Sequence, residues 1–180
     1  MNFQLKRIIK ISVCTSVICV IAPLSIVTPF SIVPISLSTL IIYTVLIILG
    51  GLDGTVSVVL YILLGMCGLP VFSGYSGGIA KVLGPTGGYI IGYIFMSVIS
   101  GIFIDKNTHM IKIIFGMIFG TIILYVFGTF WLMFQTKLTF VEALFAGVIP
   151  FILGDIIKII LAYFIGIKLK KVLNKIGDLI

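Results

Sequence analysis

Charged side chains are scarce in this sequence. Of its 180 residues only 9% are Asp, Glu, Lys or Arg, whereas 61% are hydrophobic. The mean hydropathy of +1.37 lies far above the range of water-soluble domains. The composition therefore predicts an integral membrane protein and excludes an ordinary soluble enzyme or binding module.

Several motifs that carry chemistry are also missing. No GxxxxGK[ST] phosphate-binding loop occurs, so another chain must supply any ATP-driven step. The three cysteines form no CxxC motif and no cluster with the single histidine, which argues against a disulfide framework and a zinc site. The sequence contains no HExxH motif, and its five acidic residues form no paired-carboxylate site. We expect no enzyme activity, no metal and no cofactor in this chain.

Positive charge exceeds negative charge, with a formal net charge of +7. The basic residues gather at the ends of apolar segments, which is the pattern that orients a membrane protein and contacts the lipid bilayer. This distribution argues against a nucleic-acid partner. The two terminal clusters are Lys6, Arg7 and Lys10, and Lys168, Lys170, Lys171 and Lys175.

Six apolar segments predict six transmembrane helices, separated by residues that break helices or carry charge. The predicted spans are 8–26, 36–49, 55–67, 86–104, 110–133 and 150–167, with a connection at 27–35, a tight turn at 50–54 and a short additional helix at 140–147.

Counting basic residues orients these spans. If both termini are cytoplasmic, the two terminal clusters, Lys106 and Lys112 face the cytoplasm, and only Lys81 and Lys137 face outward. This bias requires an even number of spans. The sequence therefore predicts an all-α membrane protein, a compact bundle of six transmembrane helices in one domain over residues 1–180, with cytoplasmic N- and C-termini.

Asp155 and Lys158 are the only charged residues between Glu142 and Lys168. An ion at membrane depth costs several kcal/mol unless it is paired, hydrated or bound. Asp155 precedes the cytoplasmic Lys168 by a length of helix of roughly 20 Å. In a hydrocarbon core of about 30 Å, this distance places the pair in the outer half of the bilayer. Two interpretations stay open. The pair neutralises itself, or the lysine binds a ligand carboxylate while the aspartate accepts N–H donors.

The loop at 68–85 is the second unusual segment. Its glycines allow the backbone to approach a ligand closely, and loops of this length are often binding loops. A plain outer connection is the alternative. Tyr125, Phe130 and Trp131 are candidates for the wall of a cavity, although aromatic residues at helical spacing usually belong to the core of a bundle.

Two motifs together resemble the BioY family, the biotin-binding S components of energy-coupling factor (ECF) transporters. One is Gly-Pro-Thr-Gly-Gly-Tyr-Ile-Ile-Gly at 84–92, preceded by Gly-Leu-Pro-Val-Phe at 68–72 and Gly-Gly at 77–78. The other is Pro-Phe-Ile-Leu-Gly-Asp-Ile-Ile-Lys at 150–158. The resemblance covers nearly the whole chain. It implies a multi-pass protein of a bacterial cell membrane that captures biotin near the outer face.

The resemblance also implies roles for individual residues. Asp155 and Lys158 contact biotin, whose ureido N–H groups need an acceptor and whose carboxylate needs a cation. Which residue meets which end of the ligand stays open. The loop before the fourth span closes over the ligand. The further predicted contacts are Phe72, Tyr75, Gly77, Gly78, Thr86, Gly87 and Tyr89.

Partners follow from the same resemblance. It implies a transmembrane coupling subunit and two ATPase subunits that use the ATP. Docking in the family uses small residues, commonly alanines, spaced by four on the first helix, and here Ser12 and Ser16 take those positions. Two alternatives remain: an S component for another vitamin, such as thiamine or riboflavin, and a membrane assembly or structural subunit without substrate.

Overall fold

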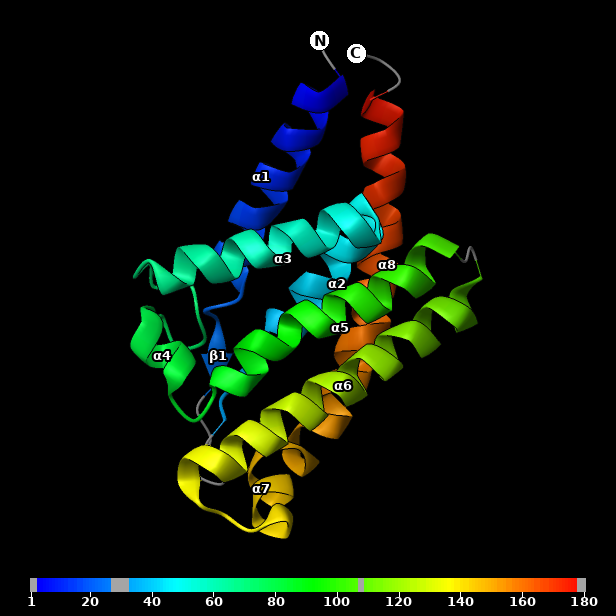
Figure 1. Cartoon of the computed structure of the whole chain (residues 1–180). Helices are drawn as coiled ribbons and strands as arrows, with labels where there is room; N and C mark the ends of the chain where they lie inside the picture. Colours follow the sequence, from blue (N-terminus) through cyan, green and yellow to red (C-terminus); the bar gives the residue numbers. More distant parts are fainter. Residues whose placement is uncertain (1–2, 27–32, 107–108, 178–180) are drawn as a thin grey trace.

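Helices make up most of the structure, a computed structural model that describes residues 3–26, 33–106 and 109–177. Its helices are α1 (Phe3–Ile21), α2 (Ser38–Leu49), α3 (Gly51–Met66), α4 (Ile79–Leu83), α5 (Gly87–Lys106), α6 (Met110–Thr136), α7 (Phe140–Gly147) and α8 (Ile149–Gly177). Figure 1 shows the N- and C-terminal ends at the same end of the molecule, with α4 and α7 toward the opposite end.

Three helices of the described part are long and apolar enough to cross a membrane, namely α5, α6 and α8. The apolar helices α2 and α3 are shorter, with 12 and 16 residues. Many large apolar side chains point outward, among them Phe119, Phe134 and Leu153. An exposed apolar surface of this kind is typical of helices that contact lipid.

The predicted helix bounds hold for α2, α5, α6 and α7 to within a few residues. Continuation of the first helix to residue 26 is wrong, because α1 ends at Ile21 before Pro23, which disfavours helical backbone in the residue before it. The next residues instead form the strand β1 (Ser25–Ile26), which pairs antiparallel with β2 (Ile35–Ser36). Between these strands, residues 27–32 of the predicted connection lie outside the described part.

Two further bounds differ from the prediction. The tight turn expected at 50–54 reduces to Gly50, whose φ of +90° favours glycine, and α3 begins at the next residue. The span predicted at 150–167 is part of a longer helix, α8, which was expected to reach Lys171 and continues to Gly177, because the lysines and apolar residues that follow favour helix and no proline interrupts them. The loop at 68–85 also contains the short helix α4, which was not predicted.

The helices pack closely around a core of large side chains that includes Ile42, Tyr43, Leu46, Met96 and Met117. The Tyr43 hydroxyl donates a 2.6 Å hydrogen bond to the Met117 carbonyl, which satisfies its polar atom inside the bundle. This core fixes α2 against α6 and thereby positions the residues of the next section.

Candidate functional site

Asp155 and Lys158 lie on α8 and are both buried, with 6% and 9% of their surface exposed. The Lys158 Nζ atom donates to Asp155 Oδ1 over 2.8 Å, within one turn of the helix. The two charges therefore neutralise each other in the structure. This geometry agrees with the interpretation in which the pair is satisfied without a ligand.

Asp155 accepts two further hydrogen bonds from other helices. Thr39 on α2 donates to Oδ1 over 3.2 Å, and Tyr125 on α6 donates to Oδ2 over 2.6 Å. Hydrogen bonds to an ionised carboxylate are among the stronger ones in proteins. The carboxylate thus links α2, α6 and α8 at a single point.

The pair forms part of the wall of a cavity whose empty volume is about 610 Å³. A mostly apolar cavity with a few polar groups is the usual form of a site that binds small molecules. Most of the lining is aromatic or aliphatic, with a few hydroxyl groups and two lysines. The aromatic lining residues are Tyr61, Phe72, Tyr89, Tyr93, Tyr125 and Phe151, and the hydroxyl-bearing aliphatic ones are Ser36, Thr39, Ser73 and Thr86.

Lys81 is the second lysine of the cavity and comes from α4 in the loop at 68–85. Its ammonium group has no hydrogen-bond or ion-pair partner among the residues that the structure describes, whereas Lys158 is paired with Asp155. The cavity therefore offers one free cation and one paired cation, together with one carboxylate. Such a set can hold a ligand that has both an anionic end and N–H donors.

The loop reaches the cavity through Phe72, which is almost fully buried and packs edge-on against Tyr61 with ring centroids 5.6 Å apart. Trp131 and Gln135 on α6 hold the end of the loop, because they donate to the carbonyls of Gly84 and Leu83 over 2.9 and 2.5 Å. The loop is therefore fastened to α6 at the edge of the cavity.

The predicted ligand contacts divide into two groups. Those that line the cavity are Phe72, Thr86, Tyr89, Asp155 and Lys158, and those that do not are Tyr75, Gly77, Gly78 and Gly87.

The second group has other surroundings. Tyr75 is 64% exposed. A Cβ atom at Gly77 would collide with the Leu69 carbonyl, and one at Gly87 would collide with the Val82 carbonyl, so these two glycines permit the loop to pack on itself. Gly78 has open space around it and a φ of +88°.

Thr39 and Lys81 are among the cavity residues that the sequence did not single out for a ligand. Thr39 is an ordinary threonine in an apolar helix. In the sequence, Lys81 is only an outward-facing lysine in the count of basic residues. Tyr125 is there one of three aromatic candidates for the wall of a cavity. Only the folded arrangement shows that its hydroxyl binds Asp155.

Ser12 and Ser16, the predicted docking residues, are both exposed on α1. The Ser16 hydroxyl donates to the Ser12 carbonyl over 3.0 Å, within the same helix. Thr15, one position away, is buried and turned toward the Ser57 carbonyl of α3 at 3.4 Å. The predicted docking face is therefore the outward face of α1.

A family model described as BioY family matches residues 1–175. The chain belongs to the BioY family. The resemblance seen in the two sequence motifs is thereby confirmed over nearly the full length.

Individual relatives of this BioY-family chain agree with the match. The chain is 35% identical to Biotin transporter BioY2 of Lactococcus lactis subsp. cremoris, over 96% of this chain and 94% of the relative. It is 34% identical to Biotin transporter BioY of Thermotoga maritima, over 93% and 97%. A solved structure, the S-component for biotin from an ECF-type ABC transporter, is similar with a TM-score of 0.86, 32% identity and 95% coverage of both chains.

Proposed function

We propose that this chain captures biotin and serves in its uptake as the substrate-specific S component of an ECF transporter, as one substrate-binding domain over residues 1–180. The observation that carries the proposal is the buried pair of Asp155 and Lys158 in the wall of an aromatic cavity. Membership of a family whose relatives are named biotin transporters supports the choice of ligand.

The chemistry of biotin suits this cavity from end to end. The ureido ring presents N–H donors, for which Asp155 is the acceptor that already collects donors from three residues. The fused sulfur-containing ring is apolar and suits walls such as Tyr93 and Phe151. The carboxylate of biotin needs a cation, and the free ammonium of Lys81 and the ammonium of Lys158 are the two within the cavity.

The loop residues predicted to contact biotin remain part of the proposal. Phe72, Thr86 and Tyr89 belong to it as lining residues. Gly77, Gly78 and Gly87 contribute the backbone shape of the loop, and Tyr75 offers an exposed ring beside it.

We also propose that α1, α2, α3, α5, α6 and α8 are six transmembrane helices of a bacterial cell membrane protein with cytoplasmic termini. The bias of basic residues supports this orientation, as does the position of both termini at one end (Figure 1). The coupling subunit of the transporter docks on the face of α1 that exposes Ser12 and Ser16, and two ATPase subunits hydrolyse the ATP. The chain itself holds no cofactor or metal.

Calorimetric titration of the purified protein with biotin tests the site. We expect tight binding by the wild type and more than tenfold weaker binding by Asp155→Asn and by Lys158→Met, because each change removes one partner of the buried pair. Lys137→Met, which removes an exposed lysine outside the cavity, is the matched control and keeps the wild-type affinity.

The outcomes separate the hypotheses. Unchanged affinity for biotin in both pair variants contradicts the assignment of the site but not the identification of biotin as the ligand. Binding of thiamine or riboflavin in place of biotin identifies an S component for another vitamin. No binding of any of the three vitamins favours an assembly subunit in which the ion pair only neutralises itself. Melting temperatures of the variants show whether each one is folded.

A further inference from the structure

A second cavity lies near the end of the molecule that holds the two termini. It is lined by the isoleucines Ile47, Ile104, Ile113 and Ile167 and by the polar residues Lys170, Lys171 and Asn174. Its empty volume, with the open space at its mouth included, is about 640 Å³. We call it the lysine groove.

The isoleucines come from four different helices and together form the apolar lining of the groove, called here the apolar wall. Ile47, Ile104 and Ile113 are buried, with 1%, 7% and 4% of their surface exposed. They lie near the end of α2, the end of α5 and the start of α6, respectively. The apolar wall therefore belongs to the packed bundle, and substitutions at the groove's rim leave it in place.

The polar rim comes from the part of α8 beyond the predicted end of the last span. Spacings of three, four and seven residues from Ile167 place Lys170, Lys171 and Asn174 along one face of this helix. Figure 1 shows the last turns of α8 continuing toward the C-terminus past the ends of α2, α5 and α6. Lys170 and Lys171 thus form the polar side of the groove.

The positive charge of this rim is not neutralised within the described residues. Neither Lys170 nor Lys171 has an ion-pair or hydrogen-bond partner there through its ammonium group. The acidic residues on neighbouring helices are engaged elsewhere. Asp105 accepts a 2.8 Å hydrogen bond from the backbone N–H of Gly51, and Asp53 pairs with Arg7.

We propose that the lysine groove binds one anionic phospholipid. The phosphate lies between Lys170 and Lys171, and an acyl chain fills the apolar side of the groove beside Ile167. A free phosphate would leave this apolar side unfilled, and a neutral lipid would leave two cations without a counterion. The occupant must therefore combine a negative head with an apolar tail. The inference does not depend on biotin binding, and under the proposed orientation the lipid comes from the cytoplasmic leaflet.

Native mass spectrometry of the detergent-purified protein tests this proposal. The protein is mixed with phosphatidylglycerol or with phosphatidylcholine that has identical acyl chains. We expect one molecule of phosphatidylglycerol to be retained, with at least tenfold higher occupancy than phosphatidylcholine. We expect the variant Lys170→Gln with Lys171→Gln to lose this preference. A large excess of glycerol phosphate, which has the head but no acyl chain, should not displace the lipid.

The matched control is Lys168→Gln with Lys175→Gln, which removes the same charge from the same helix but outside the groove. It should retain phosphatidylglycerol like the wild type. Equal retention of both lipids, loss of retention in the control, or undiminished retention in the groove variant would each overturn the proposal. If the double variant does not purify, the single variants Lys170→Gln and Lys171→Gln give the same comparison with smaller losses.

Discussion

Asp155 is the residue on which the proposed binding site depends most. One carboxylate receives hydrogen bonds from Lys158, Thr39 and Tyr125. A buried ionised group is tolerated only when such partners replace water. Removal of one partner therefore leaves the charge in place with less compensation.

Tyr125→Phe tests this dependence with little change in volume. We expect the free energy of unfolding to fall by about 1.5–3 kcal/mol, because a buried carboxylate loses a charge-assisted hydrogen bond. Thermal unfolding of the purified protein without biotin measures the change. Tyr163→Phe is the control, since that hydroxyl has no hydrogen bond to any residue that the structure describes. Equal stability of the two variants would show that the bond to Asp155 contributes little.

The residues of this site were predictable to different extents. Asp155 and Lys158 stand out because charge is rare in an apolar segment. Thr39 and Tyr125 lie 116 and 30 residues away from Asp155 along the chain, and each is an ordinary residue of a membrane helix. Their role arises from the packing of α2 and α6 against α8, which no local pattern of the sequence encodes.

At the scale of the elements, α3 and α5 cross with their backbones in close contact. A Cβ atom added to Gly51 or to Gly101 would lie 2.6 Å from backbone atoms of the other glycine. Small residues let two helix backbones approach this closely, which favours dispersion contacts and weak backbone interactions. The first turn of α3 is also held by the bond from the Gly51 N–H to Asp105 on α5.

Gly101→Ala should therefore destabilise the protein even though alanine favours helix. We expect a loss of about 1–3 kcal/mol, because the methyl group forces two backbones apart. The control is Gly154→Ala on α8, where nothing lies within 4 Å of the added Cβ atom. That variant should be neutral or up to about 1 kcal/mol more stable. Thermal unfolding checks both, and a stable Gly101→Ala variant would contradict the tight crossing.

The short helix α7 shows which elements a sequence can define. Thr139 and Glu142 form a reciprocal capping box, and the observed bounds of 140–147 equal the predicted ones. Hydrogen bonds from Thr139 lower the pKa of the Glu142 carboxyl. The carboxylate therefore stays ionised at a lower pH than an ordinary glutamate does. The strands β1 and β2 have no comparable local signal. Their pairing joins residues 25–26 to residues 35–36, which are not neighbours in the sequence.

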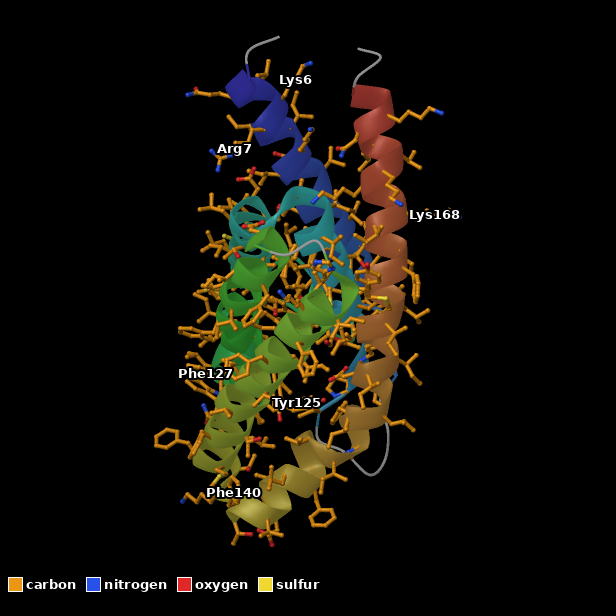
Figure 2. The ribbon with its side chains drawn as sticks, turned by 90° about the vertical axis from the view of Figure 1, so that its right-hand side faces the viewer. Lys6, Arg7, Tyr125, Phe127, Phe140 and Lys168 are labelled. Carbon is orange, nitrogen blue, oxygen red and sulfur yellow. The ribbon has the colours of Figure 1, made fainter. Side chains whose placement is uncertain are left out.

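At the scale of the whole molecule, the two cavities lie toward opposite ends of the bundle. Figure 2 shows Lys6, Arg7 and Lys168 at one end and Phe140 at the other. The helix α8 runs from the proposed biotin site to the lysine groove without interruption. The family and the helical architecture could be predicted from the sequence, whereas the lysine groove depends on the folded arrangement of α2, α5, α6 and α8.

The proposed orientation of the whole chain can be tested by chemical labelling. In a variant whose native cysteines are replaced, we expect Lys137→Cys to react with a membrane-impermeant maleimide in intact cells. Lys175→Cys should react only after the membrane is permeabilised, because the basic end faces the cytoplasm. The reverse pattern, or labelling of both sites in intact cells, would contradict cytoplasmic termini.

The three hydrogen bonds to Asp155 also set a limit on how a ligand can enter. A carboxylate offers about four lone pairs, and Lys158, Thr39 and Tyr125 already occupy three of them. One further N–H donor fits the remaining lone pair, whereas a second donor must displace one of the three partners. Thr39 has the longest of the three bonds, at 3.2 Å, and is the partner most easily displaced. Under the proposed function, a ligand donor that takes the place of Thr39 would release a link between α2 and α8, so occupancy of the site and the mutual freedom of these helices would change together.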